Sequence, residues 1–328
     1  MPAPHLNQKI FTPDVEQAAS RDGFGAGLLA AATRDARVVG LCADLTESTR
    51  MQAFAEAFPE RFVQVGIAEQ SMASVASGMA ALGKVPFIAS YAMFSPGRNW
   101  EQIRTTVVYN GANVKIAGAH AGVSVGPDGA THQAIEDIAL MRVLPTMVVL
   151  TPADSVEAQK ATLAAAAHDG PVYIRLAREK TPTVTTDASP FAIGKALRVF
   201  ERDAAHERKV GIISCGTVLA EALHAAKTLN GEGVGVSVLH LGTVKPLDEE
   251  AVLAFAEEHG ALVTVEEHQV AGGMGSAVAE FLSETRPTRI HCIGVRDQFG
   301  QSGEPAELLA HYGIDAKAIV EAGRNIAS

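Results

Sequence analysis

Short apolar runs alternate with longer, alanine-rich segments along the first half of the chain. The runs are rich in β-branched and aromatic residues and are apolar at consecutive positions, which is typical of parallel strands that are covered on both faces. These predicted strands occupy residues 38–42, 62–67, 85–91, 114–119, 147–152 and 172–177. The segments between them favour helices, so the pattern predicts a doubly wound α/β domain.

Two of the intervening segments carry specific helix signals. Residues 68–82 place apolar side chains at steps of three or four, which gives one apolar stripe on a helix. Residues 154–167 begin with Asp154 as a predicted N-cap, and Glu157 follows three residues later in a capping-box pattern.

A second α/β series follows a break in the pattern. Residues 181–190 contain two prolines and four threonines without a helical stripe, and we interpret them as an interdomain linker. The sequence therefore predicts two α/β domains, at residues 1–185 and 186–328, of which the second is smaller. Its predicted strands are 210–216, 234–241, 261–267 and 290–295, and its predicted helices are 217–229, 248–259, 275–285 and 304–311.

Composition narrows the class of protein. The chain has 328 residues, of which 47% are hydrophobic and 20% charged, so it can bury a full core. A formal net charge of −10 argues against a nucleic-acid surface, and no apolar run approaches the ~20 residues of a membrane span. The three cysteines are far apart and form no CxxC, which favours a reducing compartment over a disulfide scaffold or thiolate metal site. These features, with no apolar signal core at the start, predict a soluble, cytoplasmic enzyme or enzyme subunit.

Glu69 stands where the predicted strand 62–67 runs into the predicted helix 68–82. Ligands of open α/β sheets bind at the carboxyl ends of strands, which makes this carboxylate a candidate site residue. Two interpretations stay open. A first-turn Glu can simply be favoured by the helix dipole, or it can be buried among its apolar and small neighbours, where it would need a specific partner.

Two aromatic residues follow the next strand. Tyr91 ends it and Phe94 lies three residues further on, in a Ser-Pro-Gly turn. In a chain with only 5% aromatic residues, two rings at a strand end favour a stacking wall for a flat ligand. Ordinary core packing is the alternative.

A glycine-rich loop after the strand 114–119 concentrates polar chemistry. It holds His120, Asp128 and His132 within thirteen residues, without the helical spacing of a zinc site. Such histidines can bind hydroxyl groups or a phosphate, and a solvated loop is the alternative. Arg175 and Arg178 end the last strand of the first domain, where they favour a phosphate site or a surface ion pair with Glu179.

Together these segments resemble the carboxyl-terminal half of transketolase, and they are similar to the matching half of 1-deoxyxylulose-5-phosphate synthase. The resemblance covers about residues 15–325 and implies a thiamine diphosphate enzyme, with a pyrimidine-binding domain followed by a transketolase C-terminal domain. The first domain carries CADLTEST, VGIAEQ, GPDGATHQAIEDIALMR, LTPADSVEA and LAREKTP. The second carries VEEHQVAGGMGSAVAE and FGQSGEPAELLAHYGI.

One departure from the family changes what we expect of the diphosphate and metal site. Whole transketolases have a further amino-terminal domain, which holds magnesium and the diphosphate through a GDG motif and a downstream Asn. No GDG occurs in this sequence, so we assign no metal ligand to its own residues. The chain resembles the carboxyl-terminal (B) subunit of a split transketolase, whose amino-terminal (A) partner would hold most of the diphosphate and the Mg²⁺.

The resemblance implies a role for individual residues at the cofactor. Glu69 would contact the N1′ nitrogen of the aminopyrimidine, and aromatic rings would flank that ring. A third aromatic position of the family falls at Gly97, where transketolases often have Tyr, so the wall is thinner here or Arg98 contributes to it. The implied cofactor-binding residues are Asp44, Ile67, Glu69, Tyr91 and Phe94.

The substrate residues follow from the same resemblance. Asp128 would recognise a substrate hydroxyl, and His120 and His132 would line the channel to the sugar phosphate. Arg178 matches a phosphate-binding arginine and Arg21 a second one. Together these cations would form a positive entrance for an anionic sugar.

The implied function is transfer of a two-carbon ketol unit from a ketose phosphate to an aldose. We expect two copies of the chain to pair and two partner subunits to flank them, as an A2B2 assembly. The alternatives are the β subunit of a 2-oxo acid dehydrogenase, a 1-deoxyxylulose-5-phosphate synthase-like enzyme, and a non-catalytic regulatory or scaffold subunit. Pentose phosphates are the default substrates, and branched or sulfonated sugars stay open.

Overall fold

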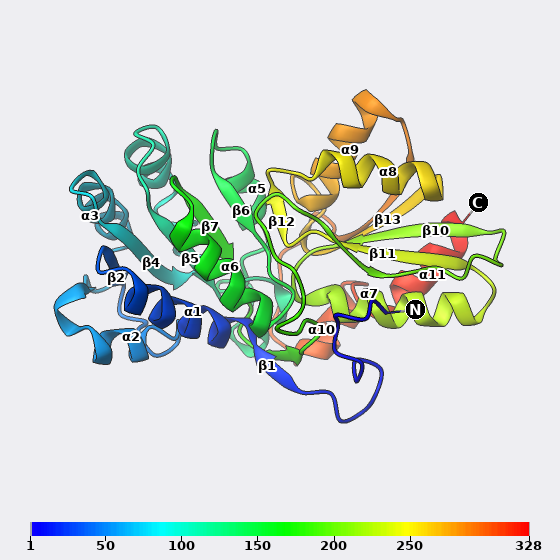
Figure 1. Ribbon diagram of the computed structural model, residues 1–328, viewed down its shortest axis with the longest axis horizontal. Coiled ribbons are helices and arrows are strands. Elements are labelled where there is room, and N and C mark those ends of the chain that lie inside the picture. Colours follow the sequence, from blue (N-terminus) through cyan, green and yellow to red (C-terminus); the bar gives the residue numbers. More distant parts are fainter. Residues whose placement is uncertain (1, 328) are drawn as a thin grey trace.

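Two large β-sheets, each with helices packed against it, lie side by side along the long axis of the molecule (Figure 1). The structure is a computed structural model that describes residues 2–327. The first sheet has seven strands in the order β12-β6-β7-β5-β4-β2-β3, and all neighbours run parallel except β12 with β6. The predicted parallel sheet is therefore confirmed. Its strands are β2 (Val38–Cys42), β3 (Phe62–Gln64), β4 (Val85–Tyr91), β5 (Lys115–Ala119), β6 (Val148–Leu150), β7 (Val172–Arg175) and β12 (Thr243–Lys245).

Helices cover both faces of this sheet, because its strands are apolar on both faces. In β2, Val38 and Cys42 pack against one group of helices, while Val39 and Leu41 pack against the other. The first group is α1 (Ser20–Arg34), α2 (Gln52–Ala57) and α6 (Ser155–Ala167). The second group is α3 (Glu69–Ala81), α4 (Trp100–Gln102) with the π-helical turn Ile103–Val108, and α5 (Asp137–Arg142).

Helix α1 was not predicted, and its packing explains why. It lies against α6 so closely that a Cβ atom at Gly23 would be 1.8 Å from the Ser155 carbonyl oxygen. A Cβ atom at Gly27 would be 2.7 Å from Cβ of Thr162. The glycines that weaken the helix signal are therefore the residues that let the two helix backbones approach.

The second sheet has five strands in the order β14-β13-β10-β11-β9, and β9 is antiparallel to β11. The four predicted strands are confirmed, whereas β9, β12 and α11 were not predicted. The strands are β9 (Leu197–Phe200), β10 (Lys209–Ser214), β11 (Gly235–His240), β13 (Ala261–Gln269) and β14 (Arg289–Val295). Helices α7 (Leu219–Gly231) and α11 (Ala316–Ile326) cover one face of this sheet. Helices α8 (Glu249–His259) and α9 (Met274–Thr285) cover the other face. Leu308 of the short helix α10 (Pro305–His311) packs into the same core as α7 and α11.

Two segments cross between the domains. Strand β12 follows the first strands of the second sheet in the chain, yet it extends the first sheet by pairing with β6. At the other end of the chain, Leu6 and Ile10 are buried in the core that α7 and α11 form. A boundary near residue 185 therefore leaves β12 in the second domain by sequence although it belongs to the first sheet.

The predicted linker is ordered at its start. Residues Lys180–Pro182 form β8, which pairs antiparallel with β1 (Gln17–Ala19). The Asp154 carboxylate caps α6 by accepting from the Glu157 N–H at 2.9 Å, which confirms the predicted N-cap. The same carboxylate accepts from the backbone N–H groups of Val184 and Thr185 at 2.8 and 2.6 Å. One side chain thus fixes both the helix and the chain that leaves the first domain.

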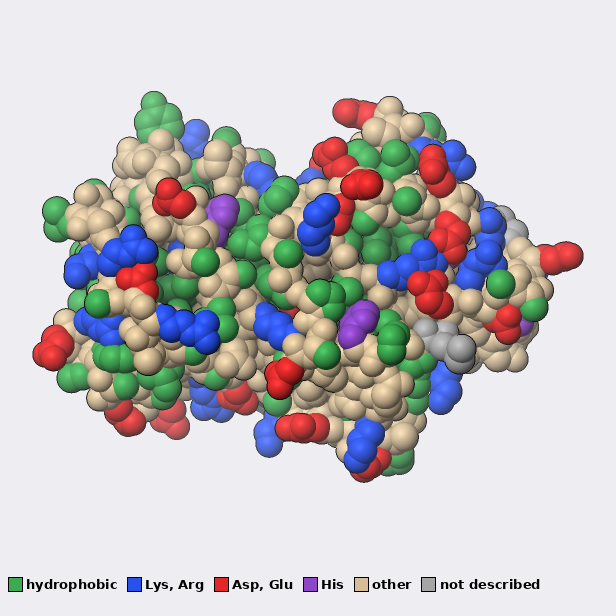
Figure 2. Space-filling view, viewed as in Figure 1, with side chains coloured by type: hydrophobic (Ala, Val, Ile, Leu, Met, Phe, Trp, Pro, Cys, Tyr) green, Lys and Arg blue, Asp and Glu red, His purple; other side chains and the backbone are tan. Residues whose placement is uncertain are grey.

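Positive and negative side chains are interspersed over the face drawn in Figure 2. The outline of the molecule is indented between the two lobes. Among residues 2–327, no helix combines the length and apolar character that a membrane crossing requires.

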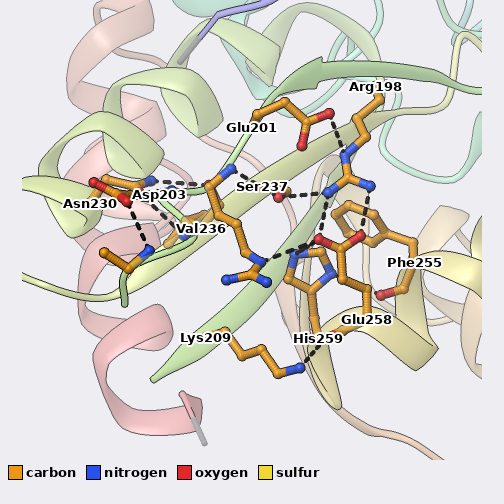
Figure 3. Close-up of polar contacts among 12 residues, drawn as sticks. Arg198, Glu201, Asp203, Lys209, Asn230, Val236, Ser237, Phe255, Glu258 and His259 are labelled. Atoms are coloured by element: carbon orange, nitrogen blue, oxygen red, sulfur yellow. Dashed lines mark hydrogen bonds and ion pairs between the residues drawn. The ribbon is translucent and has the colours of Figure 1, made fainter. Parts of the chain in front are cut away.

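An ion network holds the edge of the second sheet (Figure 3). Glu258, near the end of α8, accepts from both terminal nitrogens of Arg198 at 2.7 and 2.8 Å and from Nε of Arg202 at 3.3 Å. Arg198 also donates to Oγ of Ser237 on β11. The hydrogen bonds from Arg198 lower the pKa of Glu258 to about 2 against the opposing effect of burial. The network therefore joins β9, β11 and α8.

We predict that Glu258→Gln lowers the free energy of unfolding by about 1 kcal/mol near neutral pH, since a part-exposed pair is screened by solvent. The folded-state pKa lies below the ordinary value of 4.5, so the carboxylate stabilises the fold fully above that value. This contribution is lost as the pH falls from there toward about 2. Urea unfolding followed by circular dichroism at several pH values checks this. A difference between variant and wild type that does not shrink in acid would contradict it.

Candidate functional site

Glu69 is buried at the first position of α3, with its side chain 1% exposed. Its Oε2 atom accepts from Nη1 of Arg98 at 2.7 Å, and its Oε1 atom accepts from Oγ of Ser90 at 3.3 Å. The Asn99 side chain donates to the backbone carbonyl of Glu69 at 3.0 Å. The carboxylate thus lies in the core with Arg98 as its specific partner. This agrees with the interpretation of Glu69 as a buried acid rather than as a first-turn residue favoured only by the helix dipole.

Four rings form a cluster beside this carboxylate. Tyr91 stacks on His120 with ring centroids 3.8 Å apart and planes 23° apart. Phe94 lies 6.0 Å from Tyr91 in a nearly parallel orientation, and His132 meets Phe94 edge-on at 5.5 Å. Residues from the end of β4 and from the glycine-rich loop are therefore brought together in space, because β4 and β5 are neighbouring parallel strands whose carboxyl ends meet at one edge of the sheet.

Arg98 links the rings to the carboxylate. Its guanidinium carbon lies 4.9 Å from the centroid of the Phe94 ring, while the same side chain pairs with Glu69. The neighbouring Gly97 has no room for a side chain, since a Cβ atom there would be 2.0 Å from the Met93 carbonyl oxygen. The missing third aromatic is thus a consequence of the local backbone, and Arg98 supplies a cation at this side of the cluster.

The loop residues and two arginines form an adjoining cationic region. Nη1 of Arg21 approaches Nε2 of His120 at 3.5 Å. Nη1 of Arg178 lies 3.9 Å from Asp128 and 3.4 Å from Glu179. Glu179 was the ion-pair partner expected from the sequence, whereas the approach of Asp128 was not expected. Arg178 also donates to the Val125 carbonyl of the loop at 2.7 Å.

Arg50 belongs to this region and was missed from the sequence. Burial lowers the pKa of Arg21, and the charge of Arg50 lowers it further. Burial, Arg21 and Arg178, in that order, lower the pKa of His120 to about 3. The signal for Arg50 in the sequence was its position directly after the ADLTEST motif. The region therefore combines three guanidinium groups and a neutral imidazole with three carboxylates, since Asp22 pairs with Arg50 at 2.6 Å and Asp128 and Glu179 lie beside Arg178.

Three other expected residues have different surroundings. Arg175 was expected at a phosphate site, but it is buried and donates to Asp137 at 2.9 Å, so it is committed to an internal ion pair. Asp44 and Ile67 lie beyond the carboxyl ends of β2 and β3, and both are exposed, Ile67 at 73%. The Asp44 N–H donates to the Gln64 side chain at 2.7 Å. Neither Asp44 nor Ile67 is among the residues that form the ring cluster.

Two family models match the chain: the transketolase pyrimidine binding domain at residues 16–183 and the transketolase C-terminal domain at residues 200–319. The chain belongs to the transketolase family. Its pyrimidine-binding domain implies binding of thiamine diphosphate.

Relatives place it within the family. The 6-deoxy-6-sulfo-D-fructose transketolase subunit of Clostridium sp. is 41% identical over 98% of both chains. An apulose-4-phosphate transketolase subunit of Phocaeicola vulgatus is 35% identical over 92% of this chain and 95% of its own. Against human transketolase the identity is 34%, over 95% of this chain but only 49% of the human one.

A solved structure also resembles this chain over nearly its whole length. A split-gene transketolase, described as an inactive β4 tetramer, superimposes with a TM-score of 0.86 and 43% identity, over 94% of this chain and 98% of that one. The chain is therefore the C-terminal section, or B subunit, of a split, two-component transketolase. It contributes to a transferase complex.

We predict that His120 stays neutral from about pH 5 to pH 8, because its buried ring beside Arg21 and Arg178 disfavours the charged form. Its ring resonances in an NMR pH titration should not move over that range. His120→Gln assigns the signal. A midpoint near 6.5, the ordinary value for histidine, would show that the ring is open to solvent.

Proposed function

We propose that this subunit, together with its A partner, transfers a two-carbon ketol unit from a phosphorylated ketose to an aldose. The observation that carries the proposal is the buried Glu69 carboxylate next to stacked rings, with guanidinium groups beyond them. A planar heteroaromatic ring and an anionic substrate are the two ligands that this combination of groups suits.

The residues present fit thiamine diphosphate. Glu69 has a carboxylate oxygen whose contact in this structure is a 3.3 Å bond from Ser90, so it retains acceptor capacity. Tyr91 and Phe94 lie nearly parallel, as walls for a flat ring would. Buried polar atoms without partners among residues 2–327 include Nδ1 of His120 and Nε of Arg21, which leaves hydrogen-bonding capacity for a ligand.

Glu69 would hold the N1′ nitrogen of the aminopyrimidine and keep or release a proton at that atom. Burial keeps water from competing for the same hydrogen bond. Tyr91 and Phe94 would fix the plane of the pyrimidine, so that the carboxylate meets N1′ in that plane. When bound, the cofactor supplies the electron sink that cleavage of a carbon–carbon bond requires. Because this sequence lacks GDG, the A subunit would hold most of the diphosphate and the Mg²⁺.

The cationic region would take the anionic end of the sugar. Arg21 and Arg178 would bind its phosphate, whereas Arg50 is paired with Asp22 at 2.6 Å. His120, being neutral, would donate or accept one hydrogen bond. Asp128, already beside Arg178, would accept from a sugar hydroxyl, and His132 would line the same channel.

An exposed apolar face supports assembly next to this site. Ile67 directly precedes Ala68 and Glu69, and Val75 and Leu82 follow along and just after α3, with exposures of 73%, 42% and 84%. Large apolar side chains left exposed along one surface helix are typical of a protein interface. We assign this face to subunit contacts in an A2B2 complex, and the β4 tetramer of the split-gene relative supports self-association of such chains.

The sugar itself is the open part of the proposal. Relatives are named for a sulfonated sugar, 6-deoxy-6-sulfo-D-fructose, and for a phosphorylated one, apulose 4-phosphate. Guanidinium groups bind both anions, and we favour a phosphate because its charge of about −1.5 to −2 suits two arginines better than the single charge of a sulfonate. A 1-deoxyxylulose-5-phosphate synthase of Syntrophotalea carbinolica is also 37% identical over 92% of this chain, so its reaction belongs in the same assay.

Glu69→Ala should abolish ketol transfer by the reconstituted complex, with kcat falling at least about 100-fold, because proton transfer by a positioned group contributes that much. Assembly with the A subunit should persist. Turnover of a ketose phosphate and size-exclusion chromatography of the complex are the measurements.

Glu56→Ala is the matched control, since Glu56 is exposed on α2. If Glu69→Ala keeps wild-type kcat, the assignment of Glu69 is wrong. If the wild-type complex instead forms product from a 2-oxo acid and an acceptor, or 1-deoxyxylulose 5-phosphate, ketol transfer is wrong while the role of Glu69 stands.

Arg178→Ala should raise KM for a phosphorylated substrate by about 10-fold or more, a loss of at least ~1.4 kcal/mol. The same change should leave KM for an unphosphorylated sugar nearly unaltered. Arg34→Ala, at an exposed position of α1, serves as the control for loss of a charge. An unchanged KM for the phosphate, or a larger effect on a sulfonated sugar, would contradict phosphate recognition by this arginine.

A further inference from the structure

The end of β13 carries two consecutive buried carboxylates with different partners. Glu266 accepts from the backbone N–H groups of Met274 and Gly275 at 2.6 and 2.8 Å, so it serves the start of α9 in its own domain. Glu267 points to the opposite face, as successive strand residues do. Its Oε1 atom accepts from the Ser124 N–H at 2.5 Å, and Ser124 belongs to the loop of the first domain that carries Asp128.

The loop backbone is shaped to receive this carboxylate. Gly122 has a φ of +93°, which L side chains rarely adopt. A Cβ atom at Gly122 would lie 2.4 Å from both the carboxyl carbon and Oε1 of Glu267. The carboxylate is therefore packed against the loop backbone, and the glycine allows this close approach.

Buried hydrogen bonds keep Glu267 in this position. Arg175 donates to the backbone carbonyl of Glu267 at 2.7 Å and to that of Ala134 at 3.4 Å, while its Nε is fixed by Asp137. Burial raises the pKa of Glu267, and the positive charge of Arg175 opposes that rise. The Arg175 guanidinium thus joins β13 of the second domain to Ala134, which follows the loop.

A second tie lies at the other side of the loop. The Gln133 side chain donates to the Val123 carbonyl within the loop and to the Gln301 carbonyl of the second domain, both at 2.9 Å. At Gly129, a Cβ atom would be 2.6 Å from Oγ of Ser302. The segment between His120 and Gln133 is therefore held from two directions by the second domain.

We propose that Glu267 is a positioning residue, which holds the 120–132 loop in the conformation that presents Asp128 and His132 to the sugar. By this route the C-terminal domain, whose side chains do not form the ring cluster or the arginine region, sets affinity for the substrate. The inference rests on the proposed function, because it assigns the loop to substrate binding.

Three substitutions separate the hydrogen bond from the charge. Glu267→Ala removes both. Glu267→Gln keeps an acceptor oxygen in place, and Glu267→Asp keeps the charge but withdraws it by about 1.5 Å, the length of one carbon–carbon bond. Glu258→Ala is the matched control, because it removes a hydrogen-bonded carboxylate of the same domain that bonds to β9 and the segment after it (Figure 3).

Kinetics of the reconstituted complex give the first readout. Glu267→Ala and Glu267→Asp should each raise KM for the ketose phosphate about 10-fold or more while kcat changes less than about 3-fold, as expected where binding rather than chemistry is lost. Glu267→Gln should stay within about 3-fold of wild type in both constants, and so should Glu258→Ala.

Hydrogen exchange of the full chain gives a readout that needs no turnover. Peptides from residues 121–133 should exchange faster in the Ala and Asp variants and at wild-type rates in the Gln variant and in Glu258→Ala. Unaltered loop exchange in Glu267→Ala would overturn the proposal. So would faster exchange with unchanged KM, or a Gln variant as impaired as the Ala variant.

The two readouts also keep this inference apart from the proposed function. A wild-type complex without ketol transfer would refute the proposed function, whereas the exchange pattern would still decide whether Glu267 holds the loop. Should Glu267→Ala fail to fold, the Asp and Gln variants carry the same comparison.

Discussion

Burial of one carboxylate at the junction of a strand and a helix is the constraint on which the site depends. A carboxyl group removed from water, such as that of Glu69, needs polar partners, or it destabilises the fold. The structure meets this need with Arg98 and Ser90, and both come from the segment that also carries Tyr91 and Phe94. The segment that partners the buried carboxylate is thus also the segment that carries the aromatic rings, which links the stability of α3 to the geometry of the candidate site.

The periodicity of the sequence was enough to predict the parallel sheets, because their strands are buried on both faces and read as continuous apolar runs. It was not enough for α1, whose buried side includes Ser20, Gly23 and Gly27. Those residues are turn formers in isolation, and only the close approach of α6 makes them helical packing residues. Strands β9 and β12 were missed for a related reason, since each is a short antiparallel partner that depends on a strand from elsewhere.

In the candidate site too, some residues could be predicted from the local sequence and others could not. Positions at strand ends could be read locally, and they led to Glu69, Tyr91, Phe94 and the loop histidines. Contacts between distant segments could not: Arg21 lies 99 residues from His120, and Glu267 lies 143 residues from Ser124. The resemblance to transketolase supplied Arg21, but it pointed to neither Arg50 nor Glu267, which fold topology alone brings to the site.

The packing of the two domains bears on why the split falls where it does. Apolar side chains of α3 and α5 share one core cluster with those of α8 and α9, so the second domain completes the hydrophobic covering of the first sheet. Strand β12 adds a segment of the second domain to that sheet, and the Glu267 side chain contacts the 120–132 loop of the first domain. Separating these two domains would expose a core and release the loop, so the packing favours keeping both domains in one chain.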